Sequence, residues 1–168
     1  MGAPIGKNLA KNDFDVLGFE ADNSIKLPEI TMMPSIPAIL NEVDIVFTML
    51  PSGLEVKEIV NEFINNFNPK STLIDCSTID VKTTKEVCQT LGNKKIHMLD
   101  APVSGGVQGA KSGSLTFMVG GSRDDFDKLR FKRLFELDHL PLKMVPPLLR
   151  PRVKPLIVLE TLKPCFVL

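Results

Sequence analysis

The sequence carries no net charge, because its 20 basic and 20 acidic residues cancel over 168 residues. A chain without an excess of one sign has no general attraction for nucleic acid or for an anionic membrane surface. An anionic ligand would have to be held by local geometry. We therefore expect a small-molecule partner, with no binding to nucleic acid or to a membrane.

Long hydrophobic runs are also lacking. No stretch approaches the ~20 apolar residues that cross a bilayer, and the N-terminus has neither the basic nor the apolar region of a signal peptide. The mature chain is expected to be soluble. Its composition, 43% hydrophobic and 24% charged, is that of one ordinary globular domain with a core.

Cysteine and histidine are scarce. Cys76, Cys88 and Cys165 are odd in number and lack paired short spacings, so they are expected to be reduced structural thiols in a reducing or organellar interior. His97 and His139 stand far apart, without a cysteine or carboxylate pattern, and no metal site is predicted. We expect His97, on a buried strand, to be a satisfied core residue.

Glycine is missing from residues 129–168, whereas residues 1–121 hold all eleven glycines. The later segment holds several prolines instead: Pro141, Pro146, Pro147, Pro151, Pro155 and Pro164. Prolines this dense stop any long helix, and the residues between them follow no helical or strand period. We interpret the segment as an irregular tail foreign to the rest of the chain, of frameshifted or intronic origin. A proline-rich binding arm is the functional alternative.

Apolar runs typical of parallel strands covered on both faces alternate with segments of helical spacing in the body of the chain. The predicted strands are residues 44–50, 71–78, 94–100 and 115–121. The first predicted helix between them has apolar residues at Val56, Ile59, Val60, Phe63 and Ile64, and the second covers residues 83–91 and is ended by Gly92. We expect an α/β fold with a doubly wound, Rossmann-like, mostly parallel sheet.

The first twenty residues predict a helix and then a strand. Pro4 suits the first turn of a helix over residues 1–12, and the strand over residues 13–20 ends at Glu20. A dinucleotide-binding βαβ unit places a further strand and two more glycines before such a helix. Gly2 would then be the last glycine of the phosphate-binding loop, with a plain helix N-terminus as the alternative.

Loops at the carboxyl ends of the strands carry the candidate site, because a doubly wound sheet binds its ligands there. Glu20 can accept hydrogen bonds from both hydroxyls of an adenosine ribose and would repel the extra phosphate of NADP, or it is a surface residue in a turn. Leu50 and Pro51 would lie against a dinucleotide, or the proline only ends its strand. Thr78 offers a hydroxyl to a nicotinamide amide or a substrate, or it caps the next helix.

The most distinctive segment covers residues 100–121 and reads DAPVSGGVQGAKSGSLTFMVGG. Ser104 supplies a hydroxyl beside Gly105 and Gly106, whose backbone N–H groups can approach an anion closely and form a nest for a small carboxylate. A tight turn with positive φ is the alternative for the glycines. That alternative does not explain the neighbouring hydroxyl.

This segment resembles the substrate-binding signature of the β-hydroxyacid dehydrogenase family. MGAPIGKNLAK, FTMLPS and LIDCSTID support the resemblance in the same order, so that it covers residues 1 to about 128. It implies a Rossmann domain with NAD as cofactor, followed in the family by an all-helical domain.

The resemblance also implies an activity, the NAD-dependent oxidation of a 3-hydroxy acid to a semialdehyde. The expected substrate is 3-hydroxyisobutyrate, oxidised to methylmalonate semialdehyde in valine breakdown. A mitochondrial location is expected, with the cytoplasm as the alternative, and a homo-oligomer is allowed for the complete enzyme. The alternatives for function are a glyoxylate or succinic semialdehyde reductase of the same family and a noncatalytic, truncated partner subunit.

The resemblance assigns roles to individual positions. The cofactor contacts are Gly2, Glu20, Leu50, Pro51 and Thr78, and the residues that hold the substrate carboxylate are Ser104, Gly105 and Gly106. Glu55 stands where the family often has an asparagine near the cofactor. The family's general acid/base lysine has no counterpart, because Lys143, Lys154 and Lys163 lie among prolines. We therefore assign no catalytic residue.

Residues 1–128 are accordingly expected to be a partial NAD-binding domain, and residues 129–168 a tail outside the family. The first strand of a Rossmann sheet lies at its centre, in the order 3-2-1-4-5-6. Without that strand, we expect its neighbours to have unpaired edges, the chain to fold poorly and NAD to bind weakly.

Overall fold

The computed structural model describes residues 1–12, 14–20, 25, 27–66, 71–130 and 156–160. Its helices are α1 (Gly2–Lys11), α2 (Ile36–Leu40), α3 (Gly53–Asn65), α4 (Val81–Asn93), α5 (Gly106–Ser112) and α6 (Arg123–Arg130). Its strands are β1 (Val16–Glu20), β2 (Thr31–Met32), β3 (Ile45–Met49), β4 (Thr72–Asp75), β5 (His97–Asp100), β6 (Val103–Ser104), β7 (Thr116–Phe117), β8 (Gly120–Gly121) and β9 (Leu156–Glu160). None of the described helices has both the length and the apolar character of a membrane span.

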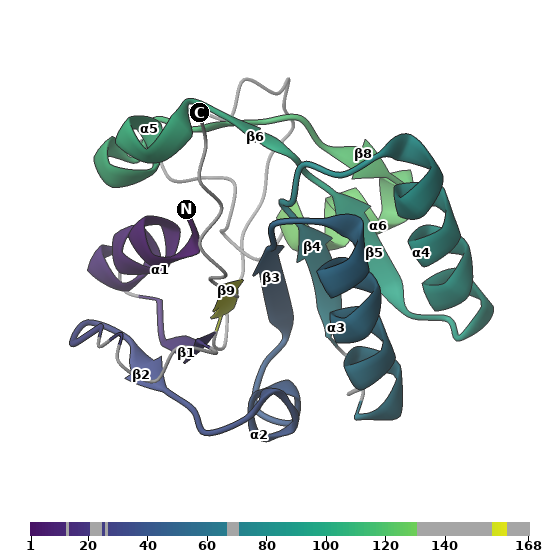
Figure 1. Cartoon of the computed structure of the whole chain (residues 1–168), viewed down its shortest axis with the longest axis horizontal. Helices are drawn as coiled ribbons and strands as arrows, with labels where there is room; N and C mark the ends of the chain where they lie inside the picture. The colour runs from purple at the N-terminus through teal and green to yellow at the C-terminus, as the bar shows by residue number, and fades with distance from the viewer. Residues whose placement is uncertain (13, 21–24, 26, 67–70, 131–155, 161–168) are drawn as a thin grey trace.

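Seven strands form one sheet in the order β2-β1-β9-β3-β4-β5-β8. All neighbouring pairs are parallel except β5 and β8, which are antiparallel. Helices α3 and α4 lie on one side of the sheet, and α1 and α5 on the other (Figure 1). The expected doubly wound, mostly parallel α/β fold is confirmed.

The centre of the sheet differs from the expectation. Strand β9 lies between β1 and β3 and is parallel to both, so that Leu156 is in register with Val16 on one side and with Ile45 on the other. The expected unpaired edges and the absence of any strand after residue 128 are therefore both wrong. The reason is local: LIVLE is an apolar run long enough for a strand covered on both faces, although the prolines around it prevent a helix. The rest of the expected irregular tail, residues 131–155 and 161–168, lies outside the described residues.

Each face of the sheet has its own core, because neighbouring residues of a strand point to opposite faces. In β3, Ile45 and Phe47 belong to the core that includes Ile5 and Leu9 of α1. Val46 belongs to the other core, against α3 and α4. A strand buried on both faces reads as a continuous apolar run, which is why this strand was predictable from the sequence.

The predicted helix before β4 is confirmed as α3, in which Val56, Ile59, Val60 and Phe63 are buried. Several boundaries differ: for example, β4 covers Thr72–Asp75 of the expected 71–78, and α4 begins at Val81 instead of residue 83. Helix α4 continues past Gly92 to Asn93, and the strand expected over residues 115–121 is divided into β7, which pairs with β6, and β8, which pairs with β5.

The short elements β2 and α2 and the helix α6 were not predicted. Serine N-caps begin both helices: Ser35 Oγ accepts a hydrogen bond from the Ala38 N–H (3.4 Å), and Ser122 Oγ accepts one from the Asp125 N–H (3.0 Å). These caps are the signal that sequence reasoning could have used. Helix α6 also carries regular structure to Arg130, slightly beyond the boundary expected at residue 128.

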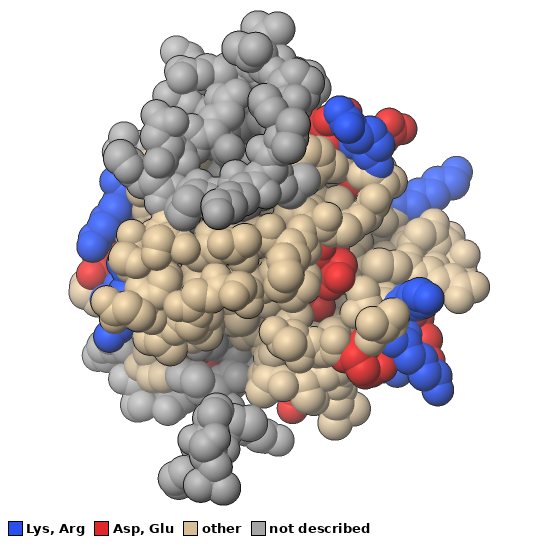
Figure 2. Space-filling view, turned by 90° about the horizontal axis from the view of Figure 1, so that it is seen from above, with Lys and Arg blue, Asp and Glu red and all other residues tan. Residues whose placement is uncertain are grey.

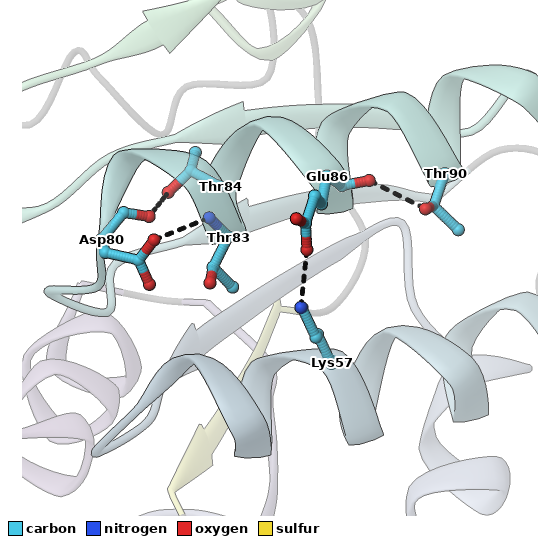
Figure 3. A network of polar contacts seen from close by, with 6 residues as sticks. All are labelled: Lys57, Asp80, Thr83, Thr84, Glu86 and Thr90. Carbon is cyan, nitrogen blue, oxygen red and sulfur yellow. Dashed lines mark hydrogen bonds and ion pairs between the residues drawn. The ribbon is translucent and has the colours of Figure 1, made fainter.

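Helices α3 and α4 are held side by side near their N-termini. Lys57 Nζ lies 2.6 Å from Glu86 Oε2, and this ion pair lowers the pKa of Glu86 (Figure 3). A Cβ on Gly53 would lie 2.8 Å from Thr83 Cγ2, so the absence of a side chain there lets the two helices approach. The ion pair is exposed and screened by solvent, so it adds little stability. Close packing at Gly53 sets how near the two helices can lie.

Candidate functional site

The residues singled out in the sequence meet at one edge of the sheet. Strands β1, β3, β4 and β5 are parallel in the sheet, so their carboxyl ends share an edge, which we call the carboxyl edge. Glu20 ends β1, Leu50 and Pro51 follow β3, Thr78 follows β4 and residues 104–106 follow β5 through β6. Figure 1 shows the N-terminus and the β6–α5 region on the side to which the β3 arrow points. Gly2, the first residue of α1, thus belongs to the same side.

Helix α1 begins at the carboxyl edge. Among the described residues its N-cap, Met1, makes no side-chain cap hydrogen bond, and its first turn holds no acidic residue that would repel an anion. Gly2 is buried in the first turn. Asn8 Nδ2 donates a hydrogen bond to the Ala110 carbonyl (2.5 Å), which ties α1 to α5. Helix α1, which carries the predicted phosphate contact, is therefore linked directly to α5, which follows the serine-glycine-glycine turn.

Ser104, Gly105 and Gly106 are all exposed. Gly105 and Gly106 have φ angles of +127° and +59°, and a Cβ on Gly105 would lie 3.2 Å from Leu115 Cδ2. A Cβ on Gly106 would meet nothing within 4 Å, so only its φ requires glycine. The tight turn is thus confirmed for both glycines. The role of residues 104–106 as a carboxylate nest stays a prediction.

The turns after β3 and β4 differ in exposure. Leu50 is buried, and its N–H donates a hydrogen bond to Ser77 Oγ (2.9 Å), so this N–H is not available to a cofactor and only van der Waals contact with Leu50 remains. Pro51 and Thr78 are exposed. The alternative that Thr78 caps α4 is wrong, because Asp80 is the N-cap and accepts a hydrogen bond from the Thr83 N–H (2.9 Å) (Figure 3).

Two acidic residues of the predicted cofactor region have defined places. Glu20 is 6% exposed at the end of β1, so the alternative of a surface residue in a turn is wrong. Glu55 lies in the first turn of α3, where it accepts a hydrogen bond from the Ser52 hydroxyl. Ser52 Oγ in turn accepts one from the Leu54 N–H (3.2 Å), so Glu55 is part of a helix cap.

Sequence reasoning missed Asp75 at the end of β4. Its side chain is 0% exposed, and its Oδ1 accepts hydrogen bonds from Thr48 Oγ1 (2.9 Å) and from the Ser77 N–H (3.0 Å). Asp100 is its neighbour in register on β5. Burial raises the pKa of both carboxyls, and Asp75 adds to the effect on Asp100. The available signal was an acid at the end of an apolar run, DCS in the sequence.

Seen from above, the described surface is mostly uncharged, with some Asp and Glu within it and Lys, Arg, Asp and Glu side chains towards its rim (Figure 2). Cys76 is buried, which raises its pKa and makes its thiol unreactive. Cys165, Lys143, Lys154 and Lys163 lie outside the described residues.

His97 has a polar partner, as expected, but it is not a core residue. Its side chain is 37% exposed, and its Nδ1 lies 2.5 Å from Asp125 Oδ1 of α6. Within the part of the chain that the structure describes, no three His, Cys, Asp or Glu residues form a group that could hold a metal ion. His139 lies outside that part.

Replacing Asp75 with asparagine is expected to raise the free energy of unfolding relative to wild type, and to do so more at neutral pH than at acid pH. The folded-state pKa of Asp75 is raised by burial, so folding becomes less favourable as the pH rises from the ordinary value near 3.8 to the raised value. Asparagine cannot ionise and avoids that loss. From pH 3 to pH 7, the difference in unfolding free energy between the variant and wild type should change by about 1–2 kcal/mol in favour of the variant. This is about the cost of leaving one buried polar group without a hydrogen bond.

Urea unfolding followed by circular dichroism at several pH values measures this difference. Asp80→Asn is the matched control, because hydrogen bonds from Thr83 lower the pKa of Asp80. Wild type gains stability as Asp80 ionises, so this variant should fall behind wild type as the pH rises. The same sign for both variants would contradict the assignment of the two carboxyls.

Comparisons with known proteins agree with this fold. Residues 1–136 match the family described as the NAD binding domain of 6-phosphogluconate dehydrogenase. Among curated proteins, the chain is similar to a probable mitochondrial 3-hydroxyisobutyrate dehydrogenase of Dictyostelium discoideum, with 39% identity over 76% of this chain and 42% of the relative. It is also similar to the human mitochondrial 3-hydroxyisobutyrate dehydrogenase, with 36% identity over 75% of this chain and 40% of the relative.

Among solved structures, the chain is similar to the 3-hydroxyisobutyrate dehydrogenase of Mycobacterium tuberculosis with L-serine. The TM-score is 0.75 and the identity 29%, over 96% of this chain and 51% of that one. The chain thus spans about two fifths of the length of the curated relatives it matches and about half of this solved structure. Since one family match covers most of the chain, the chain belongs to the family of NAD-binding domains found in 6-phosphogluconate dehydrogenase, and it resembles those of 3-hydroxyisobutyrate dehydrogenases.

Proposed function

We propose that the chain is the cofactor-binding part of an NAD-dependent 3-hydroxyacid dehydrogenase, with 3-hydroxyisobutyrate as the substrate. NAD would lie along the carboxyl edge, from the N-terminus of α1 to the turns after β3 and β4. The carboxylate of the hydroxy acid would bind at residues 104–106. Oxidation of the 3-hydroxyl group would give methylmalonate semialdehyde.

The observation that carries this proposal is the exposed turn of Ser104, Gly105 and Gly106 at the same edge as the predicted cofactor contacts. Backbone N–H groups of residues with positive φ can converge on an anion, and the Ser104 hydroxyl adds a further donor. The related Mycobacterium protein was solved with L-serine, which has a carboxylate and a 3-hydroxyl group like the proposed substrate.

The chain's own residues supply binding and orientation. NAD, when bound, is the hydride acceptor. Glu20 would accept hydrogen bonds from the adenosine ribose and disfavour NADP, which argues against the NADP-dependent glyoxylate or succinic semialdehyde reductases. None of the described residues is assigned as the general acid/base that would accept the hydroxyl proton. The assembly proposed for the enzyme is a homo-oligomer.

Heteronuclear NMR of the ¹⁵N-labelled chain tests the proposal, because it detects weak binding in a protein of 18.5 kDa. NAD is expected to shift the amide resonances of Gly2, of Thr78 and of the residues next to Pro51, which itself has no N–H. 3-Hydroxyisobutyrate is expected to shift the amide resonances of residues 104–106. Ser104→Ala should weaken binding of the hydroxy acid about tenfold, the value of one hydrogen bond to a charged group. NADP should bind more weakly than NAD. No shifts at the carboxyl edge at saturating ligand would refute the proposal.

We also propose a mitochondrial location. Relatives from Dictyostelium, mouse and human carry "mitochondrial" in their names, whereas the Mycobacterium relatives are bacterial. Fractionation of cells that express the native gene, followed by immunoblotting, distinguishes the mitochondrial matrix from the cytoplasm.

A further inference from the structure

The turns after β3 and β4 are tied together beneath the carboxyl edge by three hydrogen bonds. Thr48 Oγ1 and the Ser77 N–H both donate to Asp75 Oδ1, at 2.9 and 3.0 Å. Ser77 Oγ then accepts a hydrogen bond from the Leu50 N–H at 2.9 Å. Thr48, Asp75 and Ser77 are at most 1% exposed, so no water competes for these bonds. We call this set of side chains the buried brace.

The brace uses only one oxygen of Asp75. Oδ2 is buried and has no hydrogen-bond partner among the described residues. Burial also raises the pKa of the carboxyl, which favours its neutral form. A buried acid with one unpaired oxygen lowers stability, so its presence calls for an explanation beyond folding.

The position of the brace suggests that explanation. Asp75 lies directly under two turns that carry predicted cofactor contacts, Leu50 with Pro51 on one side and Thr78 on the other. The bond from the Ser77 N–H to Asp75 makes a tight turn, after which Ser77 points inward and Thr78 is exposed. The bond from Leu50 to Ser77 then links that turn to the one after β3.

We propose that Asp75 and Ser77 are positioning residues that hold the Leu50–Pro51 turn and the Thr78 turn at a fixed separation for the nicotinamide half of the cofactor. This inference rests on the proposed function. Neither residue needs to touch the cofactor. Turns that are ordered before binding do not have to be ordered by the ligand, and this raises affinity.

Ser77→Ala is the main test, because it removes the acceptor of the Leu50 N–H and keeps the backbone bond from residue 77 to Asp75. We expect the Kd for NAD, measured by NMR titration, to rise about tenfold. Hydrogen exchange of the Leu50 amide should become faster in the same variant. Asp75→Asn keeps an acceptor oxygen and should bind NAD within about threefold of wild type, whereas Asp75→Ala should resemble Ser77→Ala.

Ser71→Ala is the matched control. Ser71 is 1% exposed and donates to the Val43 carbonyl (2.6 Å), but it lies just before the amino end of β4, away from the carboxyl edge. It should lower stability about as much as Ser77→Ala, by ~1 kcal/mol, without changing the Kd for NAD. A purely structural role of Ser77 would make the two variants alike in both measurements.

The possible results separate the inference from the proposed function. If wild type binds NAD and Ser77→Ala binds it equally well, the inference is overturned and the proposed function stands. Equal losses of NAD affinity in Ser77→Ala and Ser71→Ala also overturn it. If wild type itself shows no NAD-dependent shifts, the proposed function fails and the inference fails with it. Ser77→Ala answers the question even if Asp75→Ala does not fold.

Discussion

A chain that ends at residue 155 is expected to lose its cooperative unfolding transition, whereas a chain that ends at residue 160 should keep it. Strand β9 occupies the centre of the sheet and is paired along its whole length with β1 and with β3. Its removal leaves two unpaired edges in the middle of a parallel sheet. The loss of two ladders of hydrogen bonds, at ~0.5–1.5 kcal/mol per bond, would approach the ~5–15 kcal/mol of a typical domain.

The two truncations are a matched pair, because they differ only in the residues of β9. Far-UV circular dichroism in urea is the suitable measurement, since the sequence has no tryptophan or tyrosine for intrinsic fluorescence. The shorter chain should show a shallow, non-cooperative loss of signal. Equal midpoints and equal slopes for both chains would mean that β9 contributes nothing to the sheet.

Gly121→Ala is expected to destabilise the chain by about 2–4 kcal/mol. Gly121 has a φ of +149°, which L side chains rarely adopt and which costs about 1–3 kcal/mol for other residues. A Cβ there would lie 2.5 Å from Leu99 Cδ2 and 3.2 Å from the Met98 carbonyl oxygen. Leu99 is 0% exposed, so its side chain has little room to move, and overpacking adds about 1–3 kcal/mol.

Gly92→Ala is the control for this substitution. Gly92 lies within α4, and a Cβ there would meet nothing within 4 Å. Alanine should stabilise the helix by about 0.5–1 kcal/mol. Urea unfolding midpoints of the two variants should therefore move in opposite directions from wild type. A neutral Gly121→Ala would show that β8 is not held against β5.

Much of the candidate site could be predicted from the sequence, because ligand-binding loops of a doubly wound sheet follow its strands. The apolar runs ending at Leu50 and near Thr78 placed those residues correctly, and the parallel sheet then brought their turns to one edge. Glu20 was also placed correctly at the end of its strand. Asp75 was missed, because the importance of a buried acid depends on partners such as Thr48, which is 27 residues away in the chain.

The sequence by itself determined the class of the fold, since continuous apolar runs alternating with helical spacing have few arrangements other than a parallel sheet between helices. Only the tertiary structure decided what lies at the centre of that sheet, because β9 pairs with β1 across more than a hundred residues, and the apolar run LIVLE does not show which strands it pairs with. The tertiary structure also shows why residue 121 is a glycine, because it lies against Leu99 of the neighbouring strand and leaves no room for a side chain. Local spacing reports which face of an element is buried, whereas contact between distant segments depends on the whole chain.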